Sequence, residues 1–252
     1  MIDVVRAFTT TAWAFARGAQ QVVPARSLAG ALALKARHPD WVSVKTARPR
    51  PASTRSAPPA ACAHSTSGRT LLLKTTNGTA GALAARNAPL VLCAGFTVAA
   101  ATARALAAHR VRRVTFVITG DEGLAEEDLA CAQYIAGLAA GSAPDAERCL
   151  RRAARPARAA EMTEGLRHGY PGLHPDDVPL CLEADRFPFA MRATPASPGG
   201  AGGGAGGGAG GGAGGGAGGG AGETGAHAPP AASCVTIARA CVRRRHPGPS
   251  RP

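Results

Sequence analysis

Acidic, basic and hydroxyl side chains follow apolar runs at three points of this 252-residue sequence. Asp3 and Arg6 belong to the first cluster, Thr75–Thr79 form the second, and Glu126–Asp128 follow a Gly-rich turn in the third. Carboxylates are ligands that Mg²⁺ takes from proteins, and guanidinium and backbone N–H groups bind phosphate oxygens. These residue types together predict a Mg²⁺-assisted phosphoryl site.

The second cluster has the clearest local pattern. The apolar run Leu71–Leu73 suits a buried parallel strand, and an Ala-rich helical segment follows from Ala80 to Arg86. A polar turn between them would point unpaired N–H groups and the positive end of a helix dipole at one spot. The turn residues are Thr75, Thr76, Asn77, Gly78 and Thr79. An ordinary strand–turn–helix joint with a Thr cap would have the same spacing, so both interpretations stay open.

The acids of the other clusters also have a structural interpretation. Asp3 could serve as a turn or cap residue at the start of a helix. Glu126, Glu127 and Asp128 could form a first helical turn that interacts favourably with the helix dipole without any ligand. The sequence contains no Walker A loop, no Gly-x-Ser-x-Gly elbow and no His-x-x-x-His pair, so those mechanisms are not indicated.

The elements that would position these clusters alternate between strand and helix. Expected strands lie at 2–5, 21–24, 71–73, 90–92 and 114–118, and expected helices at 8–18, 27–37, 80–86, 99–109, 124–140 and 145–167. A last ordered element is expected at 185–191. This alternation predicts a three-layer α/β fold with a mainly parallel sheet flanked by helices. Ligands bind outside the carboxyl ends of such strands, where the three clusters stand.

Two segments depart from this alternation. Residues 43–67 are rich in Pro, Ser, Ala and Arg without periodicity, and residues 199–222 repeat Ala-Gly-Gly-Gly. Both compositions are typical of disorder. We therefore predict one α/β domain over residues 1–193, irregular at 43–67, followed by a disordered linker and basic tail over 194–252. A short amphipathic helix at 234–245 is the alternative for the tail.

Composition limits the partners. The net charge is +13, but residues 43–67 and 195–252 each carry +4, and no aromatic residues interleave with this charge. A specific nucleic-acid function is therefore not expected. No apolar run reaches 18 residues and the start of the chain has no signal-peptide pattern, so we expect neither a membrane span nor secretion. Seven Cys without a C-x-x-C pair are consistent with a cytoplasmic protein, and the sequence leaves open whether it forms a homodimer.

Four blocks in one order resemble the 2-phosphosulfolactate phosphatase family of coenzyme M biosynthesis. They are Ile2–Ala7, Lys74–Thr79, Gly120 with Gly123 and Glu127-Asp128, and Asp185-Arg186. The resemblance covers residues 1–42 and 68–193, and it implies a Mg²⁺-dependent α/β phosphatase acting on a small phosphate ester. Site residues placed in these blocks are Asp3, Arg6, Asn77 and Arg186 as catalytic groups, Thr75, Thr76, Gly78 and Thr79 as substrate-binding groups, and Asp3, Glu127 and Asp128 as metal ligands.

The sequence departs from the family pattern at residues 43–67. The family has a Gly-Glu turn and a Gly-Phe-Asp…Gly-Asn-Ser-Pro loop there, and one shifted reading frame permits part of that pattern. We hypothesise a local frameshift bounded by two compensating slips, which sequencing of the gene across this interval would test. The expected function is hydrolysis of 2-phosphosulfolactate, impaired if this segment is expressed as given. The alternative is a non-catalytic remnant that binds a phosphorylated or sulfonated small acid.

Overall fold

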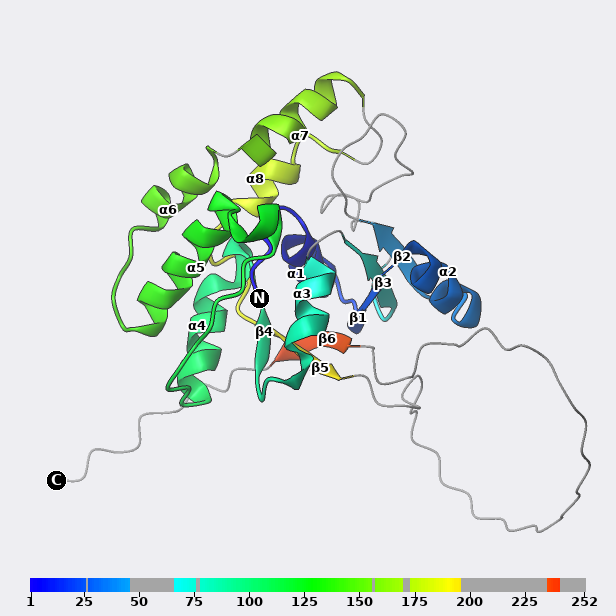
Figure 1. Cartoon of the computed structure of the whole chain (residues 1–252), viewed down its shortest axis with the longest axis horizontal. Helices are drawn as coiled ribbons and strands as arrows, with labels where there is room; N and C mark the ends of the chain where they lie inside the picture. Colours follow the sequence, from blue (N-terminus) through cyan, green and yellow to red (C-terminus); the bar gives the residue numbers. More distant parts are fainter. Residues whose placement is uncertain are drawn as a thin grey trace, which may run out of the picture.

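The computed structural model describes residues 1–25, 27–45, 66–75, 78–155, 157–169, 173–195 and 235–240. Within these ranges six strands form one sheet in the order β2-β3-β1-β6-β5-β4, with helices around it (Figure 1). The strands are β1 Gln21–Ala25, β2 Val42–Lys45, β3 Thr70–Lys74, β4 Val91–Cys93, β5 Ala190–Pro195 and β6 Val235–Ala240. The α/β class predicted from the sequence is confirmed.

The sheet is mixed. Strands β2, β3 and β1 pair in parallel, whereas the pairs β1–β6, β6–β5 and β5–β4 are antiparallel. A mainly parallel sheet is thus found in one half only. The antiparallel half depends on β5 and β6, and β6 lies in a part of the sequence where no strand was predicted.

The helices follow the predicted pattern closely. They are α1 Ala7–Ala16, α2 Leu28–Arg37, α3 Gly78–Ala84, α4 Ala99–Ala108, α5 Glu126–Ala139, α6 Ala146–Ala153, α7 Ala157–Arg167 and α8 Asp177–Cys181. Ser27 caps α2 as expected, since its side chain accepts a 3.0 Å hydrogen bond from the Gly30 N–H. The single helix expected at 145–167 is instead divided into α6 and α7. The sequence has a proline at 156, which disfavours a helical conformation in the residue before it.

Successive side chains of β1 and β3 pack into two hydrophobic clusters, one on each face of the sheet. Val22, Leu71 and Leu73 join the main cluster, which includes Phe8 and Phe15 of α1. Val23 and Leu72 point the other way and pack with Ala31 of α2 and with Trp41. Because successive side chains of a strand alternate between faces, β1 and β3 form the middle of three layers, as predicted.

The first and the last of the strands predicted along the chain, 2–5 and 114–118, are shorter than expected. Ile2 forms isolated parallel bridges with Ala94 and Ile118, and the rest of 114–118 is not a regular strand. The Ile2 N–H donates to the Val117 carbonyl at 3.0 Å, and the Asp3 N–H donates to the Ala94 carbonyl at 3.2 Å. Although the pairing is short, it places Asp3 where parallel segments end together.

Both segments expected to lack structure contain a strand. Ser43–Lys45 belong to β2, where Val44 is buried, so the irregular segment does not begin at residue 43. Residues 235–240 form β6 between β1 and β5, with Ile237 fully buried, so the tail is not unstructured throughout and the alternative of a helix is wrong for these six residues. Both strands form because they pair with neighbouring strands of the sheet, which the local composition does not reveal. Residues 46–65, 196–234 and 241–252 lie outside the described ranges.

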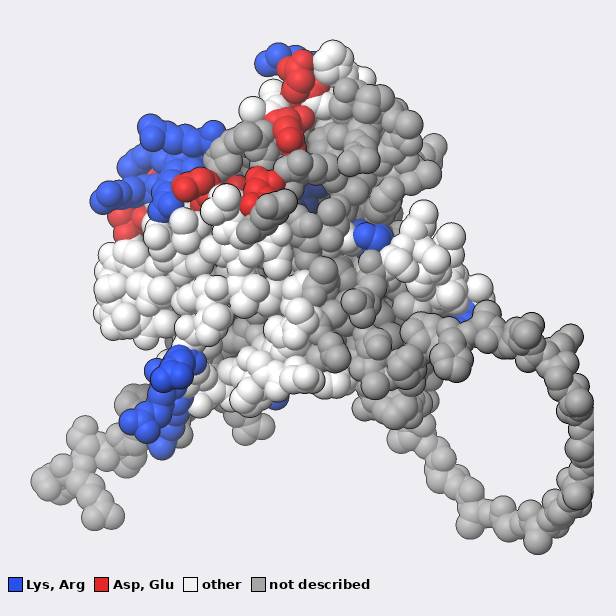
Figure 2. Space-filling model, viewed as in Figure 1, with Lys and Arg blue, Asp and Glu red and all other residues white. Residues whose placement is uncertain are grey.

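No helix in the described ranges is long and apolar enough to cross a membrane. Basic side chains gather on the surface over α6, where Arg148, Arg151 and Arg155 are exposed, with acidic side chains beside them (Figure 2). The acids predicted to bind the metal are not among these surface groups, because Asp3, Glu127 and Asp128 are all buried. A candidate site therefore has to be sought below the surface.

Candidate functional site

Asp3 lies between the end of a parallel segment and the start of α1. Its Oδ1 accepts a 2.9 Å hydrogen bond from the Ala7 N–H, the first residue of α1. This contact fulfils the capping role that the sequence left open. Oδ2 points elsewhere, toward Gly78 at the start of α3: a Cβ added to Gly78 would lie 2.5 Å from it. Only glycine lets the α3 backbone approach the carboxylate this closely.

Asp128, in the first turn of α5, approaches the segment that carries Asp3. Its Oδ1 accepts a 2.7 Å hydrogen bond from the Val4 N–H, next to Asp3 in the chain. A Cβ on Gly120 would lie 3.2 Å from Oδ2, so a second glycine backbone borders this carboxylate. Asp128 therefore does more than favour the dipole of its own helix, because it connects α5 to the segment that carries Asp3.

Burial and crowding change the acidity of Asp128. Desolvation is the main cause, the nearby charge of Asp3 is the next, and together with a smaller contribution from Glu127 they raise the pKa of Asp128 to about 8. Hydrogen bonds from the Val4 and Gly120 N–H groups oppose this rise. Two adjacent carboxylates that resist ionising together form an arrangement that a divalent cation would stabilise.

Glu127 is buried beside Asp128, with 3% of its surface exposed, whereas Glu126 is exposed and pairs with Arg152 at 2.9 Å. The three acids of the first turn of α5 thus divide into one surface ion-pair partner and two buried carboxylates. Simple helix-dipole stabilisation accounts for Glu126 and leaves the burial of the other two unexplained.

Arg6 lies just before α1 and is nearly fully buried. Its Nη1 donates to Oδ2 of Asp177 at 2.6 Å, with side-chain exposures of 4% and 0%. Burial raises the pKa of Asp177, and Arg6 is the largest influence that lowers it. Burial raises the pKa of the Cys181 thiol, and the charges of Asp177 and Asp3 add to this rise whereas that of Arg6 opposes it. Asp177 was missed by the sequence analysis, where nothing distinguished it from Asp176 beside it.

The remaining predicted residues are described only in part. Thr75 is buried at the end of β3, and the side chain of Thr79 is not described. Thr76 and Asn77 lie outside the described residues, so their predicted roles stay predictions. Thr119, which precedes Gly120, has a buried hydroxyl without a hydrogen-bond partner in the described part of the chain. In the sequence it begins the third cluster, but no role was predicted for it.

The contacts described for Asp185 and Arg186 are with other groups than the buried carboxylates. The Asp185 carboxylate accepts 2.6 Å hydrogen bonds from the Ala100 N–H, in the first turn of α4, and from the Tyr134 hydroxyl. The Arg186 guanidinium lies 5.9 Å from the centre of the Trp13 ring and 3.4 Å from Glu183. Trp13 is seven residues beyond Arg6, about 10 Å along the helix axis. In this structure, the contacts described for Arg186 do not include Asp3 or Asp128.

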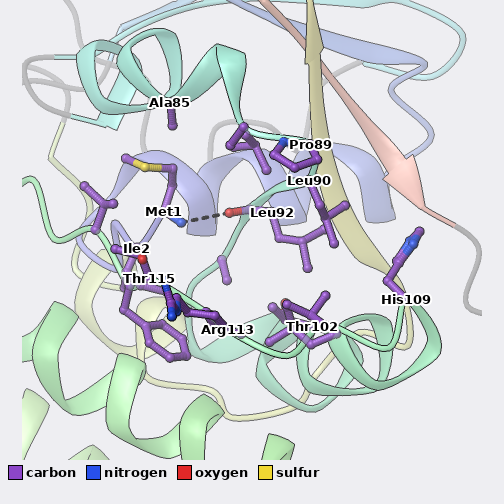
Figure 3. Close-up of a pocket in the computed structure, with 18 residues that line it drawn as sticks. Met1, Ile2, Ala85, Pro89, Leu90, Leu92, Thr102, His109, Arg113 and Thr115 are labelled. Carbon is purple, nitrogen blue, oxygen red and sulfur yellow. Dashed lines mark hydrogen bonds between the residues drawn. The ribbon is translucent and has the colours of Figure 1, made fainter.

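A separate cavity of about 490 Å³ is lined in part by Met1 and Ile2 (Figure 3). The Met1 amino group donates to the Leu92 carbonyl at 2.9 Å, and the lining is mainly apolar, with His109 and Arg113 among its few polar members. The lining includes neither Asp3, Arg6 nor Asp128. Because the lining is mainly apolar and contains none of the predicted site residues, this cavity is not the candidate site.

The buried carboxylates were tested for their fit to Mg²⁺. Among the described residues no group of three or more His, Cys, Asp or Glu side chains is arranged to hold a metal ion. Proteins usually bind Mg²⁺ through one or two carboxylates, with waters and substrate phosphate completing the octahedron. Asp3 and Asp128 fit that weaker requirement, because both are buried and each raises the cost of ionising the other.

Comparisons with known proteins point to one family. A model of the family described as 2-phosphosulpholactate phosphatase matches residues 1–192. A protein of Bacillus subtilis (strain 168) named probable 2-phosphosulfolactate phosphatase is 32% identical over 145 residues, which are 56% of this chain and 64% of that protein. One of Synechococcus sp. (strain RCC307) with the same name is 32% identical over 148 residues, 56% of this chain and 60% of that protein. The matched region spans less than two thirds of either relative.

Proposed function

The chain belongs to the 2-phosphosulpholactate phosphatase family, and from that premise we propose that it hydrolyses 2-phosphosulfolactate. The oxygen of a water molecule would attack phosphorus, and the ester oxygen would leave as the hydroxyl of sulfolactate. The observation that carries this proposal is the proximity of two buried carboxylates. Asp3 precedes α1 and lies against Gly78. Asp128 of α5 lies against Gly120 and accepts a hydrogen bond from the N–H of Val4, the residue after Asp3. The names of the two relatives support the choice of substrate.

The residues of the chain have distinct parts in this proposal. Asp3 and Asp128, with Glu127 beside them, would hold Mg²⁺. Bound there, Mg²⁺ would lower the pKa of a water and offset charge on the phosphoryl oxygens. Arg6 would donate N–H groups to the phosphate from its buried position, as guanidinium groups do to phosphates. Thr75–Thr79 would bind the remaining phosphate oxygens through backbone and hydroxyl donors. The catalytic role proposed for Arg186 rests on the resemblance alone.

A second candidate is a binding protein without turnover. It is favoured by the lack of a three-ligand metal group in the described residues and by the altered sequence at 43–67. Such a protein would keep the anion-binding donors and would bind a phosphorylated or sulfonated small acid unchanged. We also propose that the altered segment lowers activity, because relatives place polar loop residues there.

Phosphate release separates the two candidates. The purified protein is incubated with 2-phosphosulfolactate at several Mg²⁺ concentrations, and inorganic phosphate is measured. Release that requires Mg²⁺ and disappears in the Asp3→Asn variant is expected. Binding of the substrate by calorimetry without any release would favour the second candidate.

A further inference from the structure

The buried ion pair between Arg6 and Asp177 calls for a reason beyond stability. Both side chains are withdrawn from water, with exposures of 4% and 0%, and Nη1 lies 2.6 Å from Oδ2. A buried ion pair adds little net stability compared with apolar residues of similar volume, because both charges lose their hydration. Stability alone is thus a weak explanation for this pair.

The geometry around Asp177 is one-sided. Oδ2 accepts from Arg6 and, at 3.2 Å, from the His174 N–H, whereas Oδ1 is buried without a hydrogen-bond partner in the described part of the chain. The pair is therefore not the two-pronged arrangement that binds guanidinium most tightly. Asp177 thus holds Arg6 through Oδ2 alone, and its Oδ1 accepts no hydrogen bond from the described residues.

Helix α8 presents this carboxylate to the site. Asp177 begins α8 and Cys181 ends it, so they lie one turn apart on the same face, and both are fully buried. Arg6, the partner of Asp177, immediately precedes α1, and the Asp3 carboxylate accepts a hydrogen bond from the first N–H of that helix, so the ion pair and Asp3 belong to the same helix start.

We propose that Asp177 is a positioning residue that orients Arg6 and cancels its charge. The inference rests on the proposed phosphate site. With Asp177 ionised, Arg6 offers hydrogen-bond donors but no net charge, so the nearby Asp3 carboxylate leaves the site unable to hold phosphate tightly without a divalent cation. Asp177 thereby makes phosphate binding depend on the metal and limits retention of the phosphate product.

The Asp177→Asn variant isolates the charge. Asn can still accept from Arg6, so the guanidinium keeps its place while the compensating charge is removed. We expect inorganic phosphate, measured by calorimetry in EDTA, to bind at least tenfold more tightly than to wild type. In the Arg6→Gln/Asp177→Asn double variant the gain should vanish. The matched control is Asp145→Asn, which removes an exposed carboxylate that caps α6, and its phosphate affinity should stay within twofold of wild type.

The outcomes are separable from those of the proposed function. A tenfold gain in a chain that hydrolyses no ester would support the inference and overturn the function. Ester hydrolysis by wild type together with unchanged phosphate affinity in Asp177→Asn would support the proposed function and overturn the inference. If that variant does not fold, Asp177→Ser, which leaves room for a water beside Arg6, carries the same expected gain. Failure of both variants to fold would show that the pair is needed for folding and would overturn the positioning role.

Discussion

Asp128 is a buried carboxylate whose ionisation disfavours the metal-free fold. In the unfolded chain it loses its proton near its ordinary value of 3.8, whereas in the folded protein its pKa is raised to about 8. Between these values the folded state holds the proton that the unfolded state has lost. Stability must therefore fall as pH rises through this window, by up to about 1.4 kcal/mol per pH unit for one full proton.

The first prediction follows from that difference. Without metal, the melting temperature of wild type should fall between pH 5 and pH 8 more steeply than that of Asp128→Asn, in which no proton can be lost. The amide of Asn can still accept from the Val4 N–H, so the backbone contact survives. The measurement is thermal unfolding in EDTA at several pH values. Parallel curves for the two proteins would contradict the raised pKa.

Glu127 allows the metal proposal to be tested without breaking a backbone contact of Asp128. If Glu127 helps to hold Mg²⁺, Glu127→Gln should raise the Mg²⁺ concentration needed for half-maximal phosphate release, with little change in melting temperature without metal. Glu126→Gln is the matched control, because Glu126 is exposed and pairs with Arg152. An unchanged Mg²⁺ requirement in Glu127→Gln would assign that residue to helix stabilisation alone.

Asn77 follows β3 and precedes α3 in the sequence, and it lies outside the described residues. Asn77→Ala removes a polar turn group but little apolar surface. We expect thermal stability to change by about 1 kcal/mol or less and turnover to fall by roughly a hundredfold, the scale for one transition-state donor. Unfolding of the variant or undiminished turnover would show that the turn has a structural role only.

At the scale of secondary structure, α3 can approach Asp3 because its first residue is glycine. In Gly78→Ala the new Cβ would meet Asp3 Oδ2 at 2.5 Å and the Ala7 Cβ at 3.1 Å. Displacing them should cost about 1–3 kcal/mol of stability and reduce phosphate release at least tenfold. Gly30→Ala in α2 is the control, since its Cβ would meet only the Ser27 hydroxyl, at 3.2 Å. Full activity in Gly78→Ala would contradict the close approach.

Local patterns predicted most elements correctly. The Ser27 cap, the apolar run 71–73 and the Ala-rich helices depend on neighbours in the chain, which are visible in sequence. The pairing of Asp128 with Val4 and of Arg6 with Asp177 joins residues 124 and 171 positions apart. A single sequence shows no periodicity or spacing that reports such contacts. Asp3 and Asp128 were found through their place after strands, whereas Asp177 had no comparable signal.

At the scale of the whole molecule, β6 completes the sheet from beyond the Gly-rich repeat. It lies between β1 and β5, and Ile237 is fully buried. Composition concealed this strand, because the flanking segments are basic or glycine-rich and a strand of six residues is a weak signal. The antiparallel half of the sheet depends on it.

Truncation tests that dependence. A chain ending at Pro195 loses β6 and exposes the edges of two strands, so its stability should fall by at least about 2–3 kcal/mol, the value of one buried Ile, and it should aggregate more readily. A chain ending at Ala240 retains β6 and should match wild type. Urea unfolding of both chains measures the difference. Equal midpoints would show that β6 contributes nothing to the fold.

The most direct test of the central claim is phosphate release from 2-phosphosulfolactate by the full chain, with Mg²⁺ removed by EDTA and then restored. Asp3 and Asp128 meet in one buried place, and we propose that this place holds the ion and the phosphate. The account predicts release with Mg²⁺, loss of release in EDTA, recovery when Mg²⁺ is restored, and no release by Asp3→Asn at any Mg²⁺ concentration. A folded wild-type protein that releases no phosphate at any Mg²⁺ concentration, or one that releases it equally well in EDTA, would contradict the account.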